Sequence, residues 1–307
     1  MKVAIIGQGY VGLPLAIAAT SSAWNVIGID VNGKTVTNLN LGQSHIEDIS
    51  DLELQKALSA NLYRASVDFN DVSAADVVVI CVPTPLNDKR EPDLAFLSGA
   101  VTAVAPYLKK NVLLISESTS YPGTVRDVVK GLISTIREDN GADILLASAP
   151  ERVDPGNEKY NHKNTPRLVS GLTPEATKKA AEFYRSFTEN VIEVSSPEVA
   201  ETAKLLENTF RQVNIALVNE VAIISRALGI DVREVIEAAN SKPYGFMPFR
   251  PGVGVGGHCI PIDPLYLTWW ARQNGSSAEF VESADSINFN MPRYVAHRAL
   301  AMVDASI

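Results

Sequence analysis

A glycine-rich turn close to the start of the chain constrains the fold more than any other feature. The apolar run Lys2–Ile6 is followed at once by G-Q-G-Y-V-G, which matches G-x-G-x-x-G, and a second apolar run, Asn25–Asp30, ends in a carboxylate. Between a strand and a helix, such glycines let the backbone approach a pyrophosphate, the helix N-terminus offers amide donors, and the acid binds ribose hydroxyls. The sequence therefore predicts a dinucleotide-binding fold. Asp30 favours NAD over NADP, because a carboxylate would repel a 2′-phosphate.

Strand and helix signals alternate after this turn. Their order predicts an α/β fold built on a right-handed, doubly wound parallel Rossmann sheet. The expected strands are Lys2–Ile6, Asn25–Asp30, Leu62–Ser66, Asp76–Val82, Val112–Ser116, Asp143–Ser148, Arg167–Gly171 and Val191–Val194. The expected helices of this part run from Tyr10 to Ala19 and over Val31–Leu41, Leu52–Ser59, Asp93–Leu108, Thr124–Glu138 and Pro174–Ser186.

Three strand-end loops are candidates for ligand contact, because ligands of such sheets bind beyond the carboxyl ends of the strands. They begin at Cys81, Ser116 and Ala149. In the first loop, two prolines stiffen the turn around Thr84, where a nicotinamide ribose would lie. We interpret Cys81 itself as a strand-packing residue, since free cysteine is usually buried. The residues expected to contact the dinucleotide are Gly7, Gly9, Tyr10, Val11, Gly12, Asp30, Lys34 (otherwise a surface lysine), Pro83 and Thr84.

A long helix dominates the second half. The sequence S-S-P-E at residues 195–198 supplies a serine cap and a first-turn proline, and neither glycine nor proline follows until Gly229. A helix over Pro197–Leu228 would span about 48 Å at ~1.5 Å per residue. We expect it to join an NAD-binding domain, residues 1–195, to a helical domain, residues 196–307, and to build the core of a homodimer. Further helices are expected from Asp231 through Ala239 and over Leu265–Arg272 and Ala278–Val303.

Composition excludes several other classes of protein. The net charge is −8 and no run rich in lysine or arginine occurs, so nucleic acid is not an expected partner. The chain starts in an apolar strand, with no signal peptide and no apolar run of membrane-spanning length. Its two cysteines match no zinc spacing. We therefore expect a cytoplasmic protein without a metal site or membrane contact, in which thiols persist.

The second cysteine lies in a loop rich in glycine and proline, G-V-G-V-G-G-H-C-I-P-I-D-P, which runs from Gly252 to Pro264. Glycines permit close backbone approach to a ligand, and prolines fix the exit path. Cys259 has His258 directly before it and Asp263 four residues after it, a setting that suits a covalent nucleophile. A buried structural cysteine in a tight turn would fit the same loop.

Lys204 and Asn208 lie four residues apart and therefore share one face of the long helix. They could form a solvated stripe on a surface helix. If their face points toward the sheet edge, they would instead meet Glu151 and the cysteine loop.

Six motifs together resemble the UDP-glucose/GDP-mannose dehydrogenase family. They are G-Y-V-G-L-P, I-C-V-P-T-P-L-N, E-S-T-S-Y-P-G-T, P-E-R-V-D-P-G, K-L-L-E-N and G-G-H-C-I-P-I-D-P, in family order over essentially the whole chain. Three of them look most like the UDP-N-acetylglucosamine 6-dehydrogenases. The resemblance implies an NAD-dependent, four-electron oxidation of the 6-hydroxyl of a UDP-sugar to a carboxylate. UDP-N-acetylglucosamine is the favoured substrate, and UDP-glucose and UDP-N-acetylmannosamine are alternatives.

The resemblance also implies roles for individual residues. Cys259 would form a thiohemiacetal and then a thioester, which water hydrolyses, while Lys204 and Asn208 would stabilise the alkoxide and oxyanions. Glu151 and Asp263 are the candidate bases for water activation. Thr119 would bridge the catalytic water and the nicotinamide. The expected substrate contacts are Glu151, Arg152, Lys204, Asn208, Arg250 and Gly256.

Other readings of the chain stay open at this point. Family members of this type carry a third, C-terminal domain, and no third alternating α/β pattern occurs before Ile307. We therefore expect that domain to be absent, which would impair turnover. The chain could then be a non-catalytic, NAD-binding dimerisation module. It could also be a two-electron 3-hydroxyacid or 6-phosphogluconate-type dehydrogenase, which would need no cysteine.

Overall fold

A computed structural model describes residues 1–153, 156–157, 159–257 and 259–304. Its contacts divide the chain into two compact units. The first combines Met1–Thr84 with Asp93–Lys204, and the second combines Pro85–Pro92 with Leu205–Ile307. This division falls inside the long helix, whose first two turns pack on the first unit. The domain boundary that we expect after residue 195 stays a prediction.

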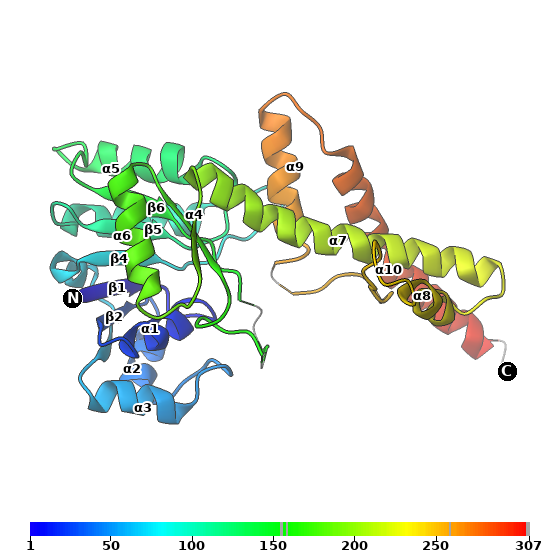
Figure 1. The fold of residues 1–307 in the computed structure, drawn as a ribbon, viewed down its shortest axis with the longest axis horizontal. Helices are drawn as coiled ribbons and strands as arrows, with labels where there is room; N and C mark the ends of the chain where they lie inside the picture. Colours follow the sequence, from blue (N-terminus) through cyan, green and yellow to red (C-terminus); the bar gives the residue numbers. More distant parts are fainter. Residues whose placement is uncertain (154–155, 158, 258, 305–307) are drawn as a thin grey trace. The chain divides into compact units, whose positions relative to one another are not determined.

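An eight-stranded sheet forms the centre of the first unit (Figure 1). The order of the strands is β3-β2-β1-β4-β5-β6-β7-β8, in which the first six follow the Rossmann order. The strands are β1 (Lys2–Ile6), β2 (Asn25–Ile29), β3 (Tyr63–Ser66), β4 (Val77–Ile80), β5 (Leu113–Ser116), β6 (Leu145–Ser148), β7 (Arg167–Gly171) and β8 (Val191–Glu193). The predicted doubly wound Rossmann fold is confirmed.

One pair of strands corrects the expectation of a wholly parallel sheet. β6 and β7 are antiparallel, with Ala147 opposite Gly171, whereas the other neighbouring pairs are parallel. A parallel pair needs a crossover connection, usually a helix. The connection from β6 to β7 has no helix in its described part, so the chain returns in the opposite direction.

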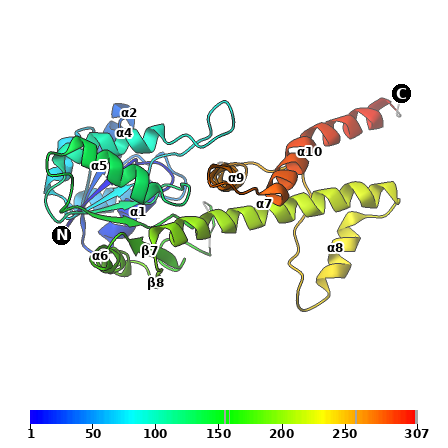
Figure 2. The ribbon, with the colours of Figure 1, turned by 90° about the horizontal axis from the view of Figure 1, so that it is seen from above.

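Helices cover both faces of this sheet (Figure 2). Side chains from α1, α2, α3 and α6 belong to one buried cluster, and side chains from η1, α4, η3 and α5 belong to the other. Their bounds are α1 (Gly12–Thr20), α2 (Gly33–Asn40), α3 (Asp51–Ser59), η1 (Phe69–Ala74), α4 (Ala95–Val104), η2 (Ala105–Tyr107), η3 (Thr124–Val129), α5 (Lys130–Ile136) and α6 (Pro174–Arg185). η3 is one turn of π-helix.

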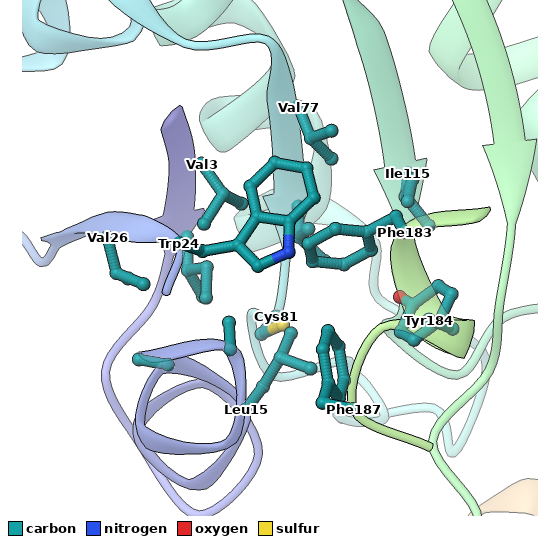
Figure 3. Close-up of a cluster of buried hydrophobic side chains, with 14 of the residues drawn as sticks. Val3, Leu15, Trp24, Val26, Val77, Cys81, Ile115, Phe183, Tyr184 and Phe187 are labelled. Atoms are coloured by element: carbon teal, nitrogen blue, oxygen red, sulfur yellow. The ribbon is translucent and has the colours of Figure 1, made fainter. Parts of the chain in front are cut away.

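Several aromatic rings pack against one another in the cluster that contains α1 and α6 (Figure 3). The ring of Phe183 packs edge-on against Trp24 at 5.0 Å and against Phe187 at 5.2 Å, a favourable geometry for aromatic pairs. Cys81 is buried in the same cluster, which confirms its interpretation as a packing residue.

Strand order places the glycine turn where the sheet changes direction. β1 pairs with β2 on one side and with β4 on the other, so Val3 lies between Val26 and Val77. The chain builds β2 and β3 outward from β1, then crosses to β4. The loops that follow β1 and β4 therefore diverge at the switch point, where dinucleotides bind in such sheets.

The second unit is helical and contains most of α7 (Pro197–Ala227). The predicted end of this helix is confirmed to within one residue. Gly229 has φ of +71°, and the amide of Ile230 reaches back to the carbonyl of Ser225 at 3.0 Å. These bonds satisfy carbonyls of the last turn, and glycine adopts the left-handed conformation at little cost. The other helices of this unit are α8 (Val232–Asn240), α9 (Asp263–Gln273) and α10 (Glu279–Asp304).

The segment Pro85–Pro92 belongs to the helical unit although it follows a strand of the sheet. The Tyr266 hydroxyl donates to the carbonyl of Pro85 at 3.0 Å, and Arg90 forms an ion pair with Asp285 at 3.1 Å. Within the described ranges, no helix has both the length and the apolar content to cross a membrane.

Candidate functional site

Two glycines of the turn after β1 are required by the protein itself. A Cβ on Gly12 would lie 1.8 Å from the carbonyl oxygen of Gly7, and a Cβ on Gly7 would lie 2.5 Å from that of Cys81. Gly7 also has φ of +89°, which favours glycine. These contacts explain two of the three glycines without any ligand.

The third glycine of the motif has a different environment. A Cβ on Gly9 would meet no described atom within 4 Å. Gly9 also lies outside the residues with positive φ, so the protein's own packing and backbone do not demand glycine here. Open space before the N-terminus of α1 is the cradle that a pyrophosphate needs. The turn therefore fits a dinucleotide.

Asp30 is held at the carboxyl end of β2 by backbone donors. Its Oδ2 accepts from the amide of Gln8 at 2.9 Å, and its Oδ1 accepts from the amide of Asn32 at 2.9 Å. The side chain of Gln8 is buried, where it donates to the carbonyl of Ile5 and accepts from the Tyr63 hydroxyl at 2.9 Å. Gln8 was missed by the sequence reasoning, which treated this position of the motif as variable.

The other residues expected at the dinucleotide lie around this edge of the sheet. The hydroxyl of Ser118 donates to the carbonyl of Val82 at 2.8 Å and accepts from its amide at 3.0 Å, which joins the loops that carry Thr84 and Thr119. The remaining predicted contacts range from exposed to half-buried: Tyr10, Lys34 and Pro83 are exposed, and Val11, Thr84 and Thr119 are half-buried.

Both carboxylate oxygens of Glu151 accept hydrogen bonds. Oε1 accepts from the amides of Arg152 and Val153, and Oε2 accepts from Arg167 at 2.7 Å. Burial disfavours the charged form, but Arg167, His162 and the amide bonds outweigh it and lower the pKa of Glu151 to about 2. Arg152 itself donates to the carbonyl of Pro166 at 2.7 Å. Glu151 is therefore ionised throughout the neutral range.

Arg167 was missed as a site residue. It is the first residue of β7 and is almost fully buried, although the chain around it is apolar. A charged residue at the start of an apolar strand was the available signal, because a buried charge requires a partner. Its acidic partners lie sixteen and fifty residues earlier in the chain.

The second unit holds the other predicted residues. The side chain of Asn208, on α7, donates to Asp263 at the start of α9. The amide of Asp263 donates to the carbonyl of Cys259 at 2.9 Å, so the carboxylate and the thiol share one turn. Asp263 is buried, whereas Cys259 is exposed, which contradicts the alternative of a buried structural cysteine.

Buried asparagines anchor the glycine-rich segment that leads to Cys259. The amide of Gly252 donates to Asn219 on α7, and Asn219 donates to Asn288 on α10, both at 2.9 Å. A Cβ on Gly254 would lie 2.8 Å from the backbone oxygen of Asn288. Arg250 and Gly256 are exposed, and His258 lies outside the described residues.

The predicted residues thus fall into two sets. One set, with the glycine turn, Asp30, Thr119 and Glu151, belongs to the first unit, and the other, with Asn208, Cys259 and Asp263, belongs to the second. Lys204 is buried at the last position that α7 contributes to the first unit, one turn before Asn208. The convergence of the two sets stays a prediction.

The sheet, the glycine turn and the acidic strand end define an NAD-dependent dehydrogenase. Comparison with known proteins refines this class. Residues 1–188 match the model of the UDP-glucose/GDP-mannose dehydrogenase family, NAD binding domain, and residues 198–290 match the central domain of that family. The chain therefore belongs to the UDP-glucose/GDP-mannose dehydrogenase family, and it is an oxidoreductase that uses NAD.

Relatives with two sugar specificities match nearly the whole chain. UDP-N-acetyl-D-mannosamine dehydrogenase of Pyrococcus horikoshii is 37% identical over 96% of this chain and 70% of its own length. UDP-N-acetyl-D-glucosamine 6-dehydrogenase of Pseudomonas aeruginosa is 38% identical over 96% of this chain and 69% of its own length. The solved structure of the Pyrococcus horikoshii enzyme superposes with a TM-score of 0.92 and covers 100% of this chain and 72% of that one.

Proposed function

We propose that the chain oxidises the 6-hydroxyl of a UDP-N-acetylhexosamine to a carboxylate, with UDP-N-acetylmannosamine as the preferred sugar. The observation that carries the reaction is the turn in which exposed Cys259 is bonded through its carbonyl to buried Asp263, itself bonded to Asn208. A two-electron dehydrogenase would not need an accessible thiol beside an oriented carboxylate and amide.

The preferred sugar departs from the expectation drawn from the motifs, which favoured the glucosamine epimer. Both epimers are represented among relatives of 36–38% identity, and mannosamine dehydrogenases from several organisms are among them. The two sugars differ only in the configuration of the carbon that carries the acetamido group. We therefore give the mannosamine epimer first place and keep the glucosamine epimer as the second candidate.

Each step of the proposed reaction is assigned to particular residues of the chain. The glycine turn and Asp30 would hold NAD, which would supply the hydride acceptor for each of the two oxidations. The thiolate of Cys259 adds to the aldehyde carbon left by the first oxidation, and the thiohemiacetal so formed becomes a thioester in the second. Water then displaces the thiol and releases the acid. Lys204 and Asn208 stabilise the negative oxygen that develops at each addition.

The structure favours different roles for the two candidate bases. Ionised Glu151, with a pKa of about 2, is a weak base at neutral pH and serves better as a fixed negative charge and hydrogen-bond acceptor. Asp263 lies in the same turn as Cys259, so we assign to it the activation of the hydrolytic water.

Counting NADH tests this proposal. The chain is incubated with excess NAD and limiting UDP-N-acetylmannosamine, UDP-N-acetylglucosamine or UDP-glucose, and the NADH formed per sugar is measured with the acid product. We expect two NADH per acid in the unaltered chain, and no acid with Cys259→Ala. One NADH per sugar, or acid production by Cys259→Ala, would exclude the thioester route. NAD binding without nucleotide-sugar binding in calorimetry would favour a non-catalytic module.

We also propose that two copies associate through α7, in the cytoplasm. Large apolar side chains recur along this helix, the last of them directly after its end, at spacings of four, seven, seven and four residues, which places them on one stripe. They are exposed: Leu206, Phe210, Leu217, Ile224 and Leu228. A continuous exposed apolar stripe on a soluble chain marks an interaction surface. A second copy would cover it, because the same stripe on both partners is self-complementary about a two-fold axis.

A further inference from the structure

A buried cluster of charged side chains lies behind Glu151, in the first unit. Arg167 donates from Nη2 to Glu151 at 2.7 Å, and its Nη1 lies 3.4 Å from Glu117, the residue that follows β5. Arg167 and Glu117 are almost fully buried. The hydroxyl of Tyr184 donates to Glu117, and its ring packs against the guanidinium at 4.8 Å. The guanidinium of Arg167 therefore contacts two carboxylates, those of Glu117 and Glu151.

We propose that Arg167 is a positioning residue that keeps Glu151 ionised and aimed, although Glu117 contacts the same guanidinium. The catalytic consequence rests on the proposed function, because it assumes that Glu151 acts during acid formation. The electrostatic part concerns only the first unit and stands without turnover.

Arg167 bonds more closely to Glu151 than to Glu117. Glu151 receives the shorter bond from Arg167 and also accepts from two backbone amides. Glu117 accepts from Tyr184 and, at 3.7 Å, from the thiol of Cys81, and its contact with Arg167 is the longer one. Charge-assisted bonds favour the ionised form of a carboxylate, so Glu151 carries the charge.

Because it is buried and Arg167 bonds mainly to Glu151, Glu117 keeps its proton more readily than an exposed glutamate does. Burial raises the pKa of Glu117 to about 7, although Arg167 acts in the opposite direction. When Glu117 loses its proton, a second negative charge competes for Arg167 and opposes the charge on Glu151. The titratable and charged groups that face this cluster from the described residues are Cys81, Glu117, Glu151, His162, Arg167 and Tyr184, with Asp48 acting on His162.

A purely structural role explains this arrangement less well. Burying ions costs several kcal/mol of desolvation each, and apolar replacements of buried pairs are often neutral or stabilising. Above the pKa of Glu117, two acids on one cation leave an excess negative charge inside the protein. The arrangement is accounted for if the chain needs a permanent negative charge at Glu151, close to the edge of the sheet where the predicted ligand lies.

The test is a direct titration of the Glu151 carboxyl by ¹³C NMR. The full chain is labelled with ¹³C-glutamate, and the Glu151 signal is assigned from its loss in Glu151→Gln. Glu117→Gln removes the competing acid and retains Arg167. The double variant Glu117→Gln/Arg167→Gln also removes the cation but keeps amide donors, and its cluster has the net charge that the unaltered cluster has when Glu117 is ionised.

We expect the Glu151 signal to stay flat from about pH 8 to about pH 5 in the unaltered chain and in Glu117→Gln, and to titrate within that window in the double variant. Titration of Glu151 in the unaltered chain within this window would overturn the proposal, as would a flat signal in the double variant. If the double variant does not fold, Arg167→Lys decides, because lysine lacks the two-pronged fork that spans both acids. If the Glu151 signal of Arg167→Lys titrates between about pH 8 and about pH 5, the proposal is supported. If that signal stays flat, the proposal is refuted.

Turnover supplies a second readout, which rests on the proposed function. Provided that the unaltered chain forms two NADH per sugar, acid production by the double variant should fall about tenfold for each pH unit below the new pKa of Glu151. Glu117→Gln should show no such loss. A failure of the NADH count in the unaltered chain would refute the proposed function, yet the NMR titration would still decide the role of Arg167.

Discussion

Asp263 connects three parts of the candidate site at the scale of single residues. Its amide bonds to the carbonyl of Cys259, its carboxylate accepts from Asn208, and it begins α9. Because the side chain is buried, its replacement changes the surroundings of the thiol without altering exposed surface. In the proposed reaction, Asp263 takes a proton from the water that attacks the thioester.

Asp263→Asn should separate oxidation from hydrolysis. Asparagine keeps the size of the side chain but cannot take a proton, and loss of a general base costs roughly 10²–10⁴-fold in rate. We expect rapid formation of two NADH per enzyme followed by acid release slowed by that factor, measured by stopped-flow absorbance and product quantification. Asp231→Asn, at the exposed cap of α8, is the control and should behave as the unaltered chain, because asparagine caps equally well. Steady acid production by Asp263→Asn would remove Asp263 as the base.

Alanine should have different effects at two glycines of the turn. At Gly9 it should weaken NAD binding, and at Gly12 it should lower stability. Gly9→Ala adds a Cβ that meets no described atom within 4 Å, so the melting temperature should change little. The methyl group would fill the pyrophosphate cradle, and NAD affinity should fall by about tenfold or more, roughly 1.4 kcal/mol, in calorimetry. Gly12→Ala is the contrasting variant, because its Cβ would lie 1.8 Å from the carbonyl of Gly7. It should lower stability first. Unchanged NAD affinity in Gly9→Ala would place the dinucleotide elsewhere.

At the scale of elements, local signals predicted most of the boundaries. The end of α7 at Ala227 lies one residue from its predicted end, because a glycine in the left-handed conformation is a local requirement. The start of α3 was also close, because Ser50 and Glu53 form a complete capping box. The direction of β7 was not predictable in this way, since it depends on the path of a long loop.

The candidate site was predictable only where its residues form motifs. Cys259 and the glycine turn were found because several residues of one short segment share a chemical purpose. Glu117 opens one of the motifs and Arg167 is a charge at the start of an apolar strand, yet their pairing was not predicted, because no local pattern encodes a contact between residues fifty positions apart. The same limit applies to Glu201 on α7.

Glu201 joins the start of α7 to the loop before η3. Its carboxylate accepts from the amides of Gly123 at 2.7 Å and Val125 at 3.2 Å. Burial raises the pKa of Glu201 to about 8, although these amides favour the charged form. The folded chain therefore keeps a proton that the unfolded chain loses above its ordinary pKa of 4.5. The stabilisation is complete below that value and is lost as the pH rises toward about 8.

Glu201→Gln should flatten the pH dependence of stability. Glutamine cannot titrate, so the fall in free energy of unfolding between about pH 5 and pH 8, up to about 1.4 kcal/mol per pH unit for one proton, should lose the Glu201 contribution. Urea unfolding across this range measures the slope. Asp139→Asn is the control: the side-chain hydrogen bond from Arg137 leads the effects that lower the pKa of Asp139 to about 2, so its loss leaves the slope in this window unchanged. Equal slopes in Glu201→Gln and the unaltered chain would show that Glu201 is ionised when folded.

At the scale of the whole molecule, the two units differ in how far they bury their large apolar side chains. The first buries its apolar side chains in two clusters around one sheet. The second leaves many large apolar side chains exposed, on α7 and also at Phe280, Phe289 and Leu300 of α10. A chain that exposes so much apolar surface on one unit is explained if that unit is completed by a second copy.

Charge placed on the α7 stripe should therefore separate the two copies. Leu217→Glu/Ile224→Glu puts two carboxylates seven residues apart on the stripe, and both would be desolvated and opposed to their counterparts in a symmetric dimer. Sedimentation velocity should give twice the 33.1 kDa chain mass for the unaltered protein and the single mass for the variant. Val67→Glu, at an exposed apolar residue after β3, is the control and should leave the mass doubled. Because both changed positions are exposed in the single chain, the variant has no reason to unfold, and its NAD affinity should persist. A doubled mass in the α7 variant would mean that the stripe is not the contact between copies.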